Sequence, residues 1–240
     1  TGREVLLEAH DVDPDDPAPS QWGDVIPEKD EVLRSASTAG GSLFCSYLKD
    51  AHTQVFQHDL EGKLIREIEL PALGTAGGFG GEKEDKTLFY TFTSFTYPPA
   101  IYKFDVESGA SEIFRRTEVS FTPEDYVAEQ TFYTSRDGTR VPLFIVYKKG
   151  LQRDGGNPAL LYAYGGFNVT MLPSFSATRI LLLENGFVYA QACLRGGGEY
   201  GEEWHLQGNL TNKQNVFDDF AAVLQHLIDK EGKLELNPEE

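Results

Sequence analysis

The hydrophobic positions change their pattern at about residue 122. From about residue 40 to residue 118, short runs rich in aromatic and β-branched residues alternate with turn residues, which predicts a series of β-strands. These runs are SLFCSYL, QVFQHDL, KLIREIEL, TLFYTFTS, AIYKFDV and SEIFRR. The first part of the chain is therefore expected to be all β.

A weak internal repeat lies within this series. The segment VFQHDLEGKLIREI, which starts at Val55, resembles IYKFDVESGASEIF, which starts at Ile101, and places Asp59 and Asp105 46 residues apart. A strand, an acidic turn with glycine and a returning strand at this period are typical of β-propeller blades. Two copies alone leave an ordinary antiparallel sandwich as the alternative.

The second part of the chain predicts strands that alternate with helices. Asp137-Gly138 predicts a hairpin turn between two strands. The runs NPALLYAYGGF and FVYAQAC lack polar alternation, as expected for strands of a parallel sheet that is covered on both faces. Between them, SATRILLLENG is a helix candidate that ends at Gly186.

A longer amphipathic helix is predicted near the end of the sequence. Asn215 and Asp218 resemble a capping pair at its start. Apolar residues recur at helical spacing and are expected to face the core: Val216, Phe217, Phe220, Leu224, Leu227 and Ile228. The alternation of strands and helices predicts an α/β fold.

Composition and charge restrict the function classes. The 240 residues carry a formal net charge of −17, which argues against nucleic acid and anionic membranes as partners. No apolar run reaches the ~20 residues that a membrane-spanning helix needs. Cys45 and Cys193 lie far apart and are expected to be free thiols in a reducing compartment. The spacing of His and Cys residues predicts no metal site.

A glycine pattern in CLRGGGEYGEEWH suggests a nucleotide site at first. Gly196, Gly198 and Gly201 fit the G-x-G-x-x-G pattern of dinucleotide-binding loops. Such a site needs a helix that begins at the loop, but Gly208 ends any helix within two turns. The neighbouring glutamates would also repel phosphates: Glu199, Glu202 and Glu203. We therefore interpret the glycines as shaping a tight loop after a strand, and predict no cofactor.

Several stretches resemble the prolyl oligopeptidase family of serine peptidases. They are LLYAYGGFNVTMLPSFSATR, LRGGGEYGEEWHLQGNLTNKQNVFDDFAAVLQHLI, SRDGTRVPLFIVYKKG, TFTSFTYPPAIYKFD and YLKDAHTQVFQHDLEG. The combination of YGGF, RGGGEYGEEWH and NKQNVFDDF favours the proline-specific branch over the oligopeptidases for basic residues. The resemblance covers nearly the whole chain.

The resemblance implies a fold and an activity. The fold is an α/β-hydrolase portion, a parallel sheet with flanking helices, preceded by an all-β portion that resembles the last blades of a seven-bladed β-propeller. Residues 1–122 would be the C-terminal part of the propeller, and residues 123–240 the first part of the catalytic domain. The whole protein would cleave short proline-containing peptides on the carboxyl side of proline through an acyl-enzyme. We expect a cytoplasmic monomer, or a periplasmic one if a leader was removed upstream.

The catalytic triad of the family has no counterpart in these residues. The family's nucleophile lies on a strand-to-helix elbow in a G-x-S-x-G-like motif, and no G-x-S-x-G occurs here. The strand before that elbow is expected to start at about LELNPEE, where the sequence stops. None of the histidines maps to the catalytic one: His10, His52, His58, His205 and His226. The segment alone is therefore expected to lack the triad.

Two site residues can be carried over from the family. Tyr164 in YAYGGF matches the tyrosine whose phenol donates a hydrogen bond to the oxyanion of the tetrahedral intermediate. Phe167 matches a residue of the substrate pocket, where its ring would pack against the pyrrolidine of proline. From the residues alone, a packed aromatic like Tyr162 is the favoured interpretation of Tyr164, and plain core packing is the alternative for Phe167.

Charged residues near the glycine loop are interpreted as structural. Arg195 and Glu199 are expected to form an ion pair that shapes the loop. Two pairs of neighbouring acids have no basic partner in the pattern and are expected on solvated faces: Asp218-Asp219 and Glu202-Glu203.

Two alternative functions stay open at this point. A sister oligopeptidase, specific for basic residues or for acylaminoacyl peptides, would share the fold and differ in pocket residues. A non-catalytic binding module would keep the propeller–hydrolase architecture without a serine elbow.

Overall fold

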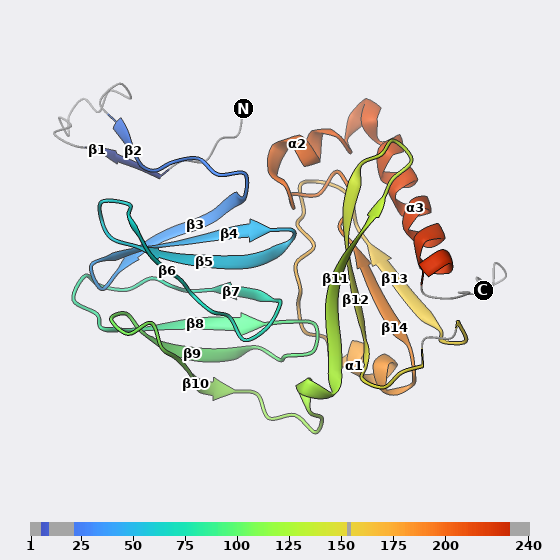
Figure 1. Cartoon of the computed structure of the whole chain (residues 1–240), viewed down its shortest axis with the longest axis horizontal. Coiled ribbons are helices and arrows are strands. Elements are labelled where there is room, and N and C mark those ends of the chain that lie inside the picture. The colour runs from blue at the N-terminus through green and yellow to red at the C-terminus, as the bar shows by residue number, and fades with distance from the viewer. Residues whose placement is uncertain (1–5, 10–21, 153–154, 231–240) are drawn as a thin grey trace.

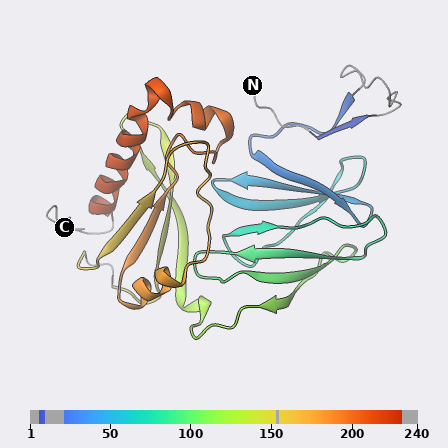
Figure 2. The same cartoon turned by 180° about the vertical axis from the view of Figure 1, so that it is seen from behind.

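The computed structural model describes residues 6–9, 22–152 and 155–230, which form two parts that lie side by side (Figure 1). One part consists of antiparallel sheets, and the other is a mixed sheet with helices packed on it. Figure 2 shows the same two parts from behind. Residues 231–240, which include LELNPEE, lie outside the described residues.

Two four-stranded antiparallel sheets make up most of the first part. Their strand orders are β3-β4-β5-β6 and β10-β9-β8-β7. The strands are β3 (Val32–Ala39), β4 (Ser42–Lys49), β5 (His52–His58), β6 (Leu64–Glu67), β7 (Thr75–Gly77), β8 (Thr87–Thr93), β9 (Ala100–Asp105) and β10 (Ser111–Arg116). Two further strands pair antiparallel with each other, β1 (Leu6–Ala9) and β2 (Trp22–Ile26).

The sequence repeat marks equivalent strands of these two sheets. Its first copy covers β5 and β6, and its second copy covers β9 and β10. Asp59 accepts a hydrogen bond from the Lys63 amide at 2.8 Å, and Asp105 accepts one from the Ser108 amide at 2.7 Å. Each aspartate therefore closes the turn that follows its strand. Each sheet joins consecutive strands in order, as in propeller blades.

Aromatic side chains fill the space between the two blades. Phe44 of β4 packs on Phe79 and Phe104, with ring centroids 6.1 Å and 5.9 Å apart. Phe79 stacks in turn on Tyr90 of β8 at 4.5 Å. These rings belong to one buried core that draws residues from both sheets.

The second part is a four-stranded sheet with the order β11-β12-β14-β13. The strands are β11 (Tyr126–Thr134), β12 (Arg140–Lys148), β13 (Ala159–Ala163) and β14 (Val188–Ala192). Among them only β13 and β14 are parallel, so the predicted parallel sheet is limited to one pair of the described strands. The hairpin at Asp137-Gly138 joins β11 directly to β12 and makes that pair antiparallel. A helix connects β13 to β14 and returns the chain in the same direction.

Helices cover both faces of this sheet. Helix α3 (Gln214–Lys230) contributes Val223 to the core that contains Leu143 of β12. Helix α1 (Ala177–Glu184) packs Ile180 in the core that contains Phe144 of β12. Because neighbouring strand residues point to opposite faces, the two helices lie on opposite sides of the sheet. The remaining short helices are α2 (Gly201–Leu206) and the 3₁₀ helices η2 (Pro123–Asp125) and η3 (Leu210–Asn212).

Both predicted helices form, but the buried face of α3 differs from the predicted one. Helix α3 begins at Gln214, so the expected cap Asn215 lies inside it. Among the described residues Phe217 and Phe220 are exposed, which differs from the prediction that they face the core. The sheet covers a stripe that lies further round the helix and consists of Val216, Asp219, Val223 and Leu227.

The turn between β4 and β5 inserts into the second part. Asp50 and Ala51 both have positive φ angles, of 48° and 67°, and Ala51 is buried in the core on the α1 face. The Tyr200 phenol donates a hydrogen bond to Asp50 Oδ1 at 2.6 Å. Phe95, from the loop after β8, packs on Phe144 with 5.2 Å between ring centroids. Residues of both parts thus complete one core.

Candidate active site at the carboxyl ends of β13 and β14

The parallel pair β13 and β14 brings two loops together at one edge of the sheet. Tyr164 follows β13 directly, and the glycine-rich loop that contains Arg195 follows β14. Binding sites of α/β sheets lie at this edge, because the carboxyl ends of parallel strands meet there. The side chain of Tyr164 is 47% exposed, so Tyr164 is not a fully packed aromatic.

The backbone turns sharply after Tyr164. Gly165 has a φ of +61°, and a Cβ atom there would lie 2.6 Å from a methyl of Val216 and 2.9 Å from Leu194 Cβ. Only glycine therefore fits between β13 and the neighbouring elements. Lys213 Nζ donates a hydrogen bond to the Gly165 carbonyl at 2.7 Å, which holds the turn from the other side.

Phe167 lies on the same turn and points away from the core. Its side chain is 86% exposed, so Phe167 does not belong to the core of the described residues. Phe167 and Asn168 both have positive φ angles, of 51° and 57°. The Asn168 amide donates to the Gly196 carbonyl at 3.0 Å, so the loop after β13 rests on the loop after β14. Tyr164 and Phe167 are thus presented together at the sheet edge.

The predicted ion pair between Arg195 and Glu199 does not form. Arg195 Nη2 instead lies 2.6 Å from Asp219 Oδ1, and Nη1 lies 2.5 Å from Asp137 Oδ2. The Arg195 guanidinium lowers the pKa of Asp137 to about 2 through these hydrogen bonds. The prediction is wrong because the hairpin turn and α3 place two other carboxylates, Asp137 and Asp219, on the guanidinium of Arg195.

Asp219 is a buried contact of the glycine-rich loop that the sequence interpretation missed. It is 0% exposed and accepts hydrogen bonds from the Arg195 side chain and from the Arg195 amide, so its assignment to a solvated face is wrong. Its position on the apolar stripe with Val216 and Val223 could have revealed this, because a carboxylate there needs a buried cation.

Glu199 is buried elsewhere in the same loop. Its Oε1 accepts a hydrogen bond from the Met171 amide at 2.8 Å. Burial is the largest cause that raises the pKa of Glu199 to about 7. Two other contacts close the loop: the Trp204 indole donates to the Leu194 carbonyl at 3.1 Å, and Gly196 N donates to the Trp204 carbonyl at 2.9 Å.

An apolar groove of about 460 Å³ adjoins Tyr164. Its wall on the α3 side is formed by the exposed rings of Phe217 and Phe220. The other lining residues are Ala163, Leu194, Val216, Ala221 and Leu224. Phe217 and Phe220 therefore face the same edge of the sheet as Tyr164, the candidate oxyanion donor.

Two family models match the chain. The model of the prolyl oligopeptidase N-terminal beta-propeller domain matches residues 8–117, and the model of the prolyl oligopeptidase family matches residues 173–235. The chain belongs to the prolyl oligopeptidase family. Its two parts, blades followed by the start of the peptidase domain, have the architecture of that family.

Named relatives of this prolyl oligopeptidase-family chain agree with the models. The prolyl endopeptidase of Elizabethkingia miricola is 52% identical over 211 residues, which are 88% of this chain and 30% of the relative. The prolyl endopeptidase of Dictyostelium discoideum is 37% identical, over 87% of this chain and 28% of the relative. The chain therefore spans about 30% of the length of these relatives.

Solved structures of the family superpose on the chain. One comes from a study of two prolyl endopeptidases and has a TM-score of 0.87 at 46% identity, covering 95% of this chain and 34% of that protein. Prolyl oligopeptidase B of Galerina marginata in its apo form has a TM-score of 0.79 at 32% identity, covering 88% of this chain and 31% of that protein.

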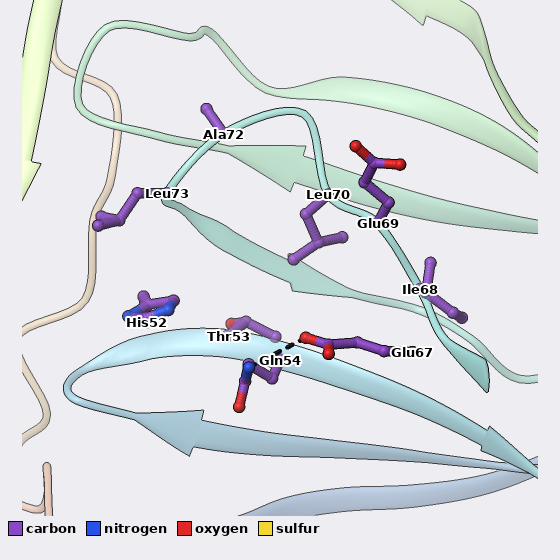
Figure 3. A pocket seen from close by; sticks show the side chains of 9 residues that line it. All are labelled: His52, Thr53, Gln54, Glu67, Ile68, Glu69, Leu70, Ala72 and Leu73. Atoms are coloured by element: carbon purple, nitrogen blue, oxygen red, sulfur yellow. Dashed lines mark hydrogen bonds between the residues drawn. The ribbon is translucent and has the colours of Figure 1, made fainter. Parts of the chain in front are cut away.

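A second hollow of about 440 Å³ lies in the propeller part of this prolyl oligopeptidase-family chain (Figure 3). Leu70 and Leu73, from the loop after β6, lie across from His52 of β5. Gln54 Nε2 donates to Glu67 Oε1 at 3.0 Å, so these polar groups satisfy each other. Burial lowers the pKa of His52. Neither Tyr164 nor Phe167 lines this hollow.

Other expectations concern residues outside both hollows. Cys45 and Cys193 are buried and form no disulfide with each other, and burial raises the pKa of Cys45 to about 11. Within residues 6–9, 22–152 and 155–230, no three His, Cys, Asp or Glu residues are grouped to bind a metal. The helices of the same residues include none long and apolar enough to cross a bilayer.

Proposed function

We propose that the chain forms part of a serine oligopeptidase that cleaves short peptides on the carboxyl side of proline through an acyl-enzyme. The observation that supports this most directly is the half-exposed Tyr164 on a glycine turn at the carboxyl end of β13. The prolyl endopeptidases of two Elizabethkingia species, 52% and 51% identical, support the proline specificity. The nucleophile, aspartate and histidine would come from the rest of the protein.

Tyr164 is proposed as a donor of the oxyanion hole. Its neutral phenol would hydrogen-bond to the oxygen that becomes negative when the nucleophile attacks the scissile carbonyl. A donor already in place at that position is typically worth ~3–4 kcal/mol of the barrier. The Gly165 turn and the hydrogen bond from Lys213 support such a role, because both fix the backbone next to Tyr164.

Phe167 is proposed as a contact for the proline of the substrate. An exposed aromatic ring three residues after the oxyanion donor is suited to stack on the flat, apolar pyrrolidine ring. Its positive φ angle supports the assignment, since a strained conformation at a presented side chain is common at binding sites.

The division into domains is also a proposal. Residues 1–122 would be the C-terminal part of the propeller and residues 123–240 the start of the catalytic domain, with η2 at the junction. The propeller would limit access to short peptides. The protein is proposed to be a monomer in the cytoplasm, which the two buried thiols support, or in the periplasm if a leader was removed upstream.

The experiment is hydrolysis of a short Gly-Pro reporter amide by the full-length protein. Turnover that a serine-directed phosphonate abolishes, with no turnover of the matching reporters ending in arginine or carrying an acylated amino acid, would support the proposal. Preference for one of the latter two reporters would indicate a sister oligopeptidase. Absence of turnover and of phosphonate labelling in a folded sample would contradict a peptidase and favour a binding module.

A further inference from the structure

Glu199 is a buried carboxyl that the proposed chemistry does not use. It is 1% exposed and lies between the loop after β13 and the loop after β14. Its Oε1 accepts the Met171 amide at 2.8 Å, whereas its Oε2 has no hydrogen-bond partner among the described residues. A buried carboxyl oxygen without a hydrogen-bond partner lowers the stability of the fold, so a glutamate at this position needs an explanation.

The two glycines before Glu199 bring the loops into direct contact. A Cβ atom on Gly197 would lie 2.2 Å from Glu199 Oε2 and 2.9 Å from the Val169 carbonyl oxygen. A Cβ atom on Gly198 would lie 2.8 Å from the Thr170 hydroxyl oxygen, which also lacks a partner among the described residues. The glycines therefore make room for the carboxyl of Glu199 against the loop after β13.

The segment that presents Phe167 is held at both of its ends. Near the first end, the Asn168 amide donates to the Gly196 carbonyl at 3.0 Å. At the other end, the Met171 amide donates to Glu199, and the Met171 carbonyl accepts from Gln191 Nε2 at 3.1 Å. At this second end, the Glu199 side chain holds the backbone amide of Met171.

The surroundings of Glu199 favour its protonated form. Burial raises its pKa to about 7, against the attraction of Arg34 from β3 and of the Met171 amide. Cys193 at the end of β14 is fully buried and adds no positive charge. The Arg195 guanidinium is engaged by Asp219 and Asp137. On the propeller side, Asp50 is bound by the phenol of Tyr200, the residue next to Glu199.

We propose that Glu199 is a positioning residue for the candidate active site: its carboxyl holds the segment from Phe167 to Met171, and thereby Phe167, against the loop after β14. The inference rests on the proposed peptidase function for its catalytic consequence. A proton on Oε2 makes this oxygen a donor beside the Val169 carbonyl, which borders the same space. Loss of that proton leaves an unpaired charge in a buried site and loosens the segment.

The test compares three variants of the full-length protein. Glu199→Ala removes the acceptor, Glu199→Gln keeps an acceptor oxygen for Met171, and Glu202→Gln on the exposed side of α2 is the matched control. Hydrogen–deuterium exchange of peptides that cover residues 168–172 measures directly how strongly the backbone amides of this segment, including Met171, are protected. We expect faster exchange and an about 10-fold higher KM for a Gly-Pro reporter in Glu199→Ala, with a smaller change in kcat. Glu199→Gln and Glu202→Gln should keep the exchange protection.

Unchanged exchange of this segment in Glu199→Ala would overturn the proposal. If the alanine variant does not fold, Glu199→Gln decides through the pH dependence of KM. The wild-type KM should rise between pH 6 and pH 8 as the carboxyl ionises, and the glutamine variant should not show this rise. Identical KM profiles would overturn the proposal. A wild-type protein that turns over no proline reporter would refute the proposed function, while the exchange measurement would still decide the role of Glu199.

Discussion

Arg195 and Asp219 form a buried ion pair that ties the loop after β14 to helix α3. Asp219 accepts hydrogen bonds from Nε, Nη2 and the backbone amide of Arg195, at 3.0, 2.6 and 3.1 Å. Asp137 binds the same guanidinium from the β11–β12 turn. Three segments that are distant in the sequence thus meet beneath the turn of Tyr164 and Gly165.

Replacing Asp219 by asparagine should strongly destabilise the protein. Arg195 would keep the partly exposed Asp137 as a counter-ion but would lose the charge of its buried partner, and loss of such charge-assisted hydrogen bonds costs about 1.5–3 kcal/mol. The measurement is the free energy of unfolding in urea. Asp218→Asn is the matched control, because Asp218 accepts its hydrogen bond from Gln214 on the helix surface. Equal effects of the two substitutions would contradict the assignment.

Tyr164→Phe should slow hydrolysis of a Gly-Pro reporter by about 10²–10³-fold, because one donor to the oxyanion is removed. The melting temperature should not change, since the phenol is partly exposed. Steady-state kinetics of the full-length protein provide the measurement. Tyr162→Phe, two residues earlier on β13 and similarly exposed, should have wild-type rates. A wild-type rate for Tyr164→Phe would remove the oxyanion role.

Phe167→Ala should raise KM for proline reporters about 10-fold, because the ring loses its contact with the pyrrolidine. The side chain is so exposed that stability should change by less than about 0.5 kcal/mol. Leu210→Ala is the control, since Leu210 is 88% exposed on η3 and also has a positive φ. A loss of stability without a change in KM would indicate a packing role instead.

The raised pKa of Glu199 predicts a pH-dependent stability. Burial raises this pKa from 4.5 to about 7, so the native state binds the proton more tightly than the unfolded chain. The resulting stabilisation is complete below about pH 4.5 and is lost as the pH rises through about 7. Relative to the wild type, Glu199→Gln should therefore gain about 2–3 kcal/mol of unfolding free energy between pH 5 and pH 8. Parallel stability curves for the two proteins would exclude a shifted carboxyl.

Tyr200→Phe should weaken the junction between the two parts, because its phenol bonds Asp50 at 2.6 Å. Loss of a hydrogen bond to a charged group costs about 1.5–3 kcal/mol. A double-mutant cycle with Asp50→Asn isolates the pair, and the unfolding free energies should not be additive. Additive effects would show that the two side chains act independently.

Local patterns predicted the elements well, because turns and periodicity depend on neighbouring residues. The Asp137-Gly138 hairpin, the end of α1 before Gly186 and the blade repeat around Asp59 and Asp105 are all present. Phe217 differs from the prediction because helical periodicity predicts the width of an apolar face, but not which residues at its edge the described sheet covers.

The partners of buried charges could not be predicted in the same way. Arg195 lies four residues from Glu199, and local spacing favoured that pair. In the structure Arg195 forms ion pairs with Asp219 and Asp137, which the packing of α3 and the hairpin bring close to it. Such pairings depend on tertiary contacts between distant segments. The resemblance identified Tyr164 and Phe167, but gave no sign of Glu199 beneath them.

The shared core on the α1 face has a consequence for producing the two parts separately. Ala51 and Phe95 of the propeller part cover Phe144 and Tyr189 of the hydrolase sheet. A fragment that starts at residue 123 would expose this aromatic surface to water and would tend to self-associate. Residues of the propeller part therefore complete the interior of the hydrolase part, and we expect the two parts to be stable only when they are produced together.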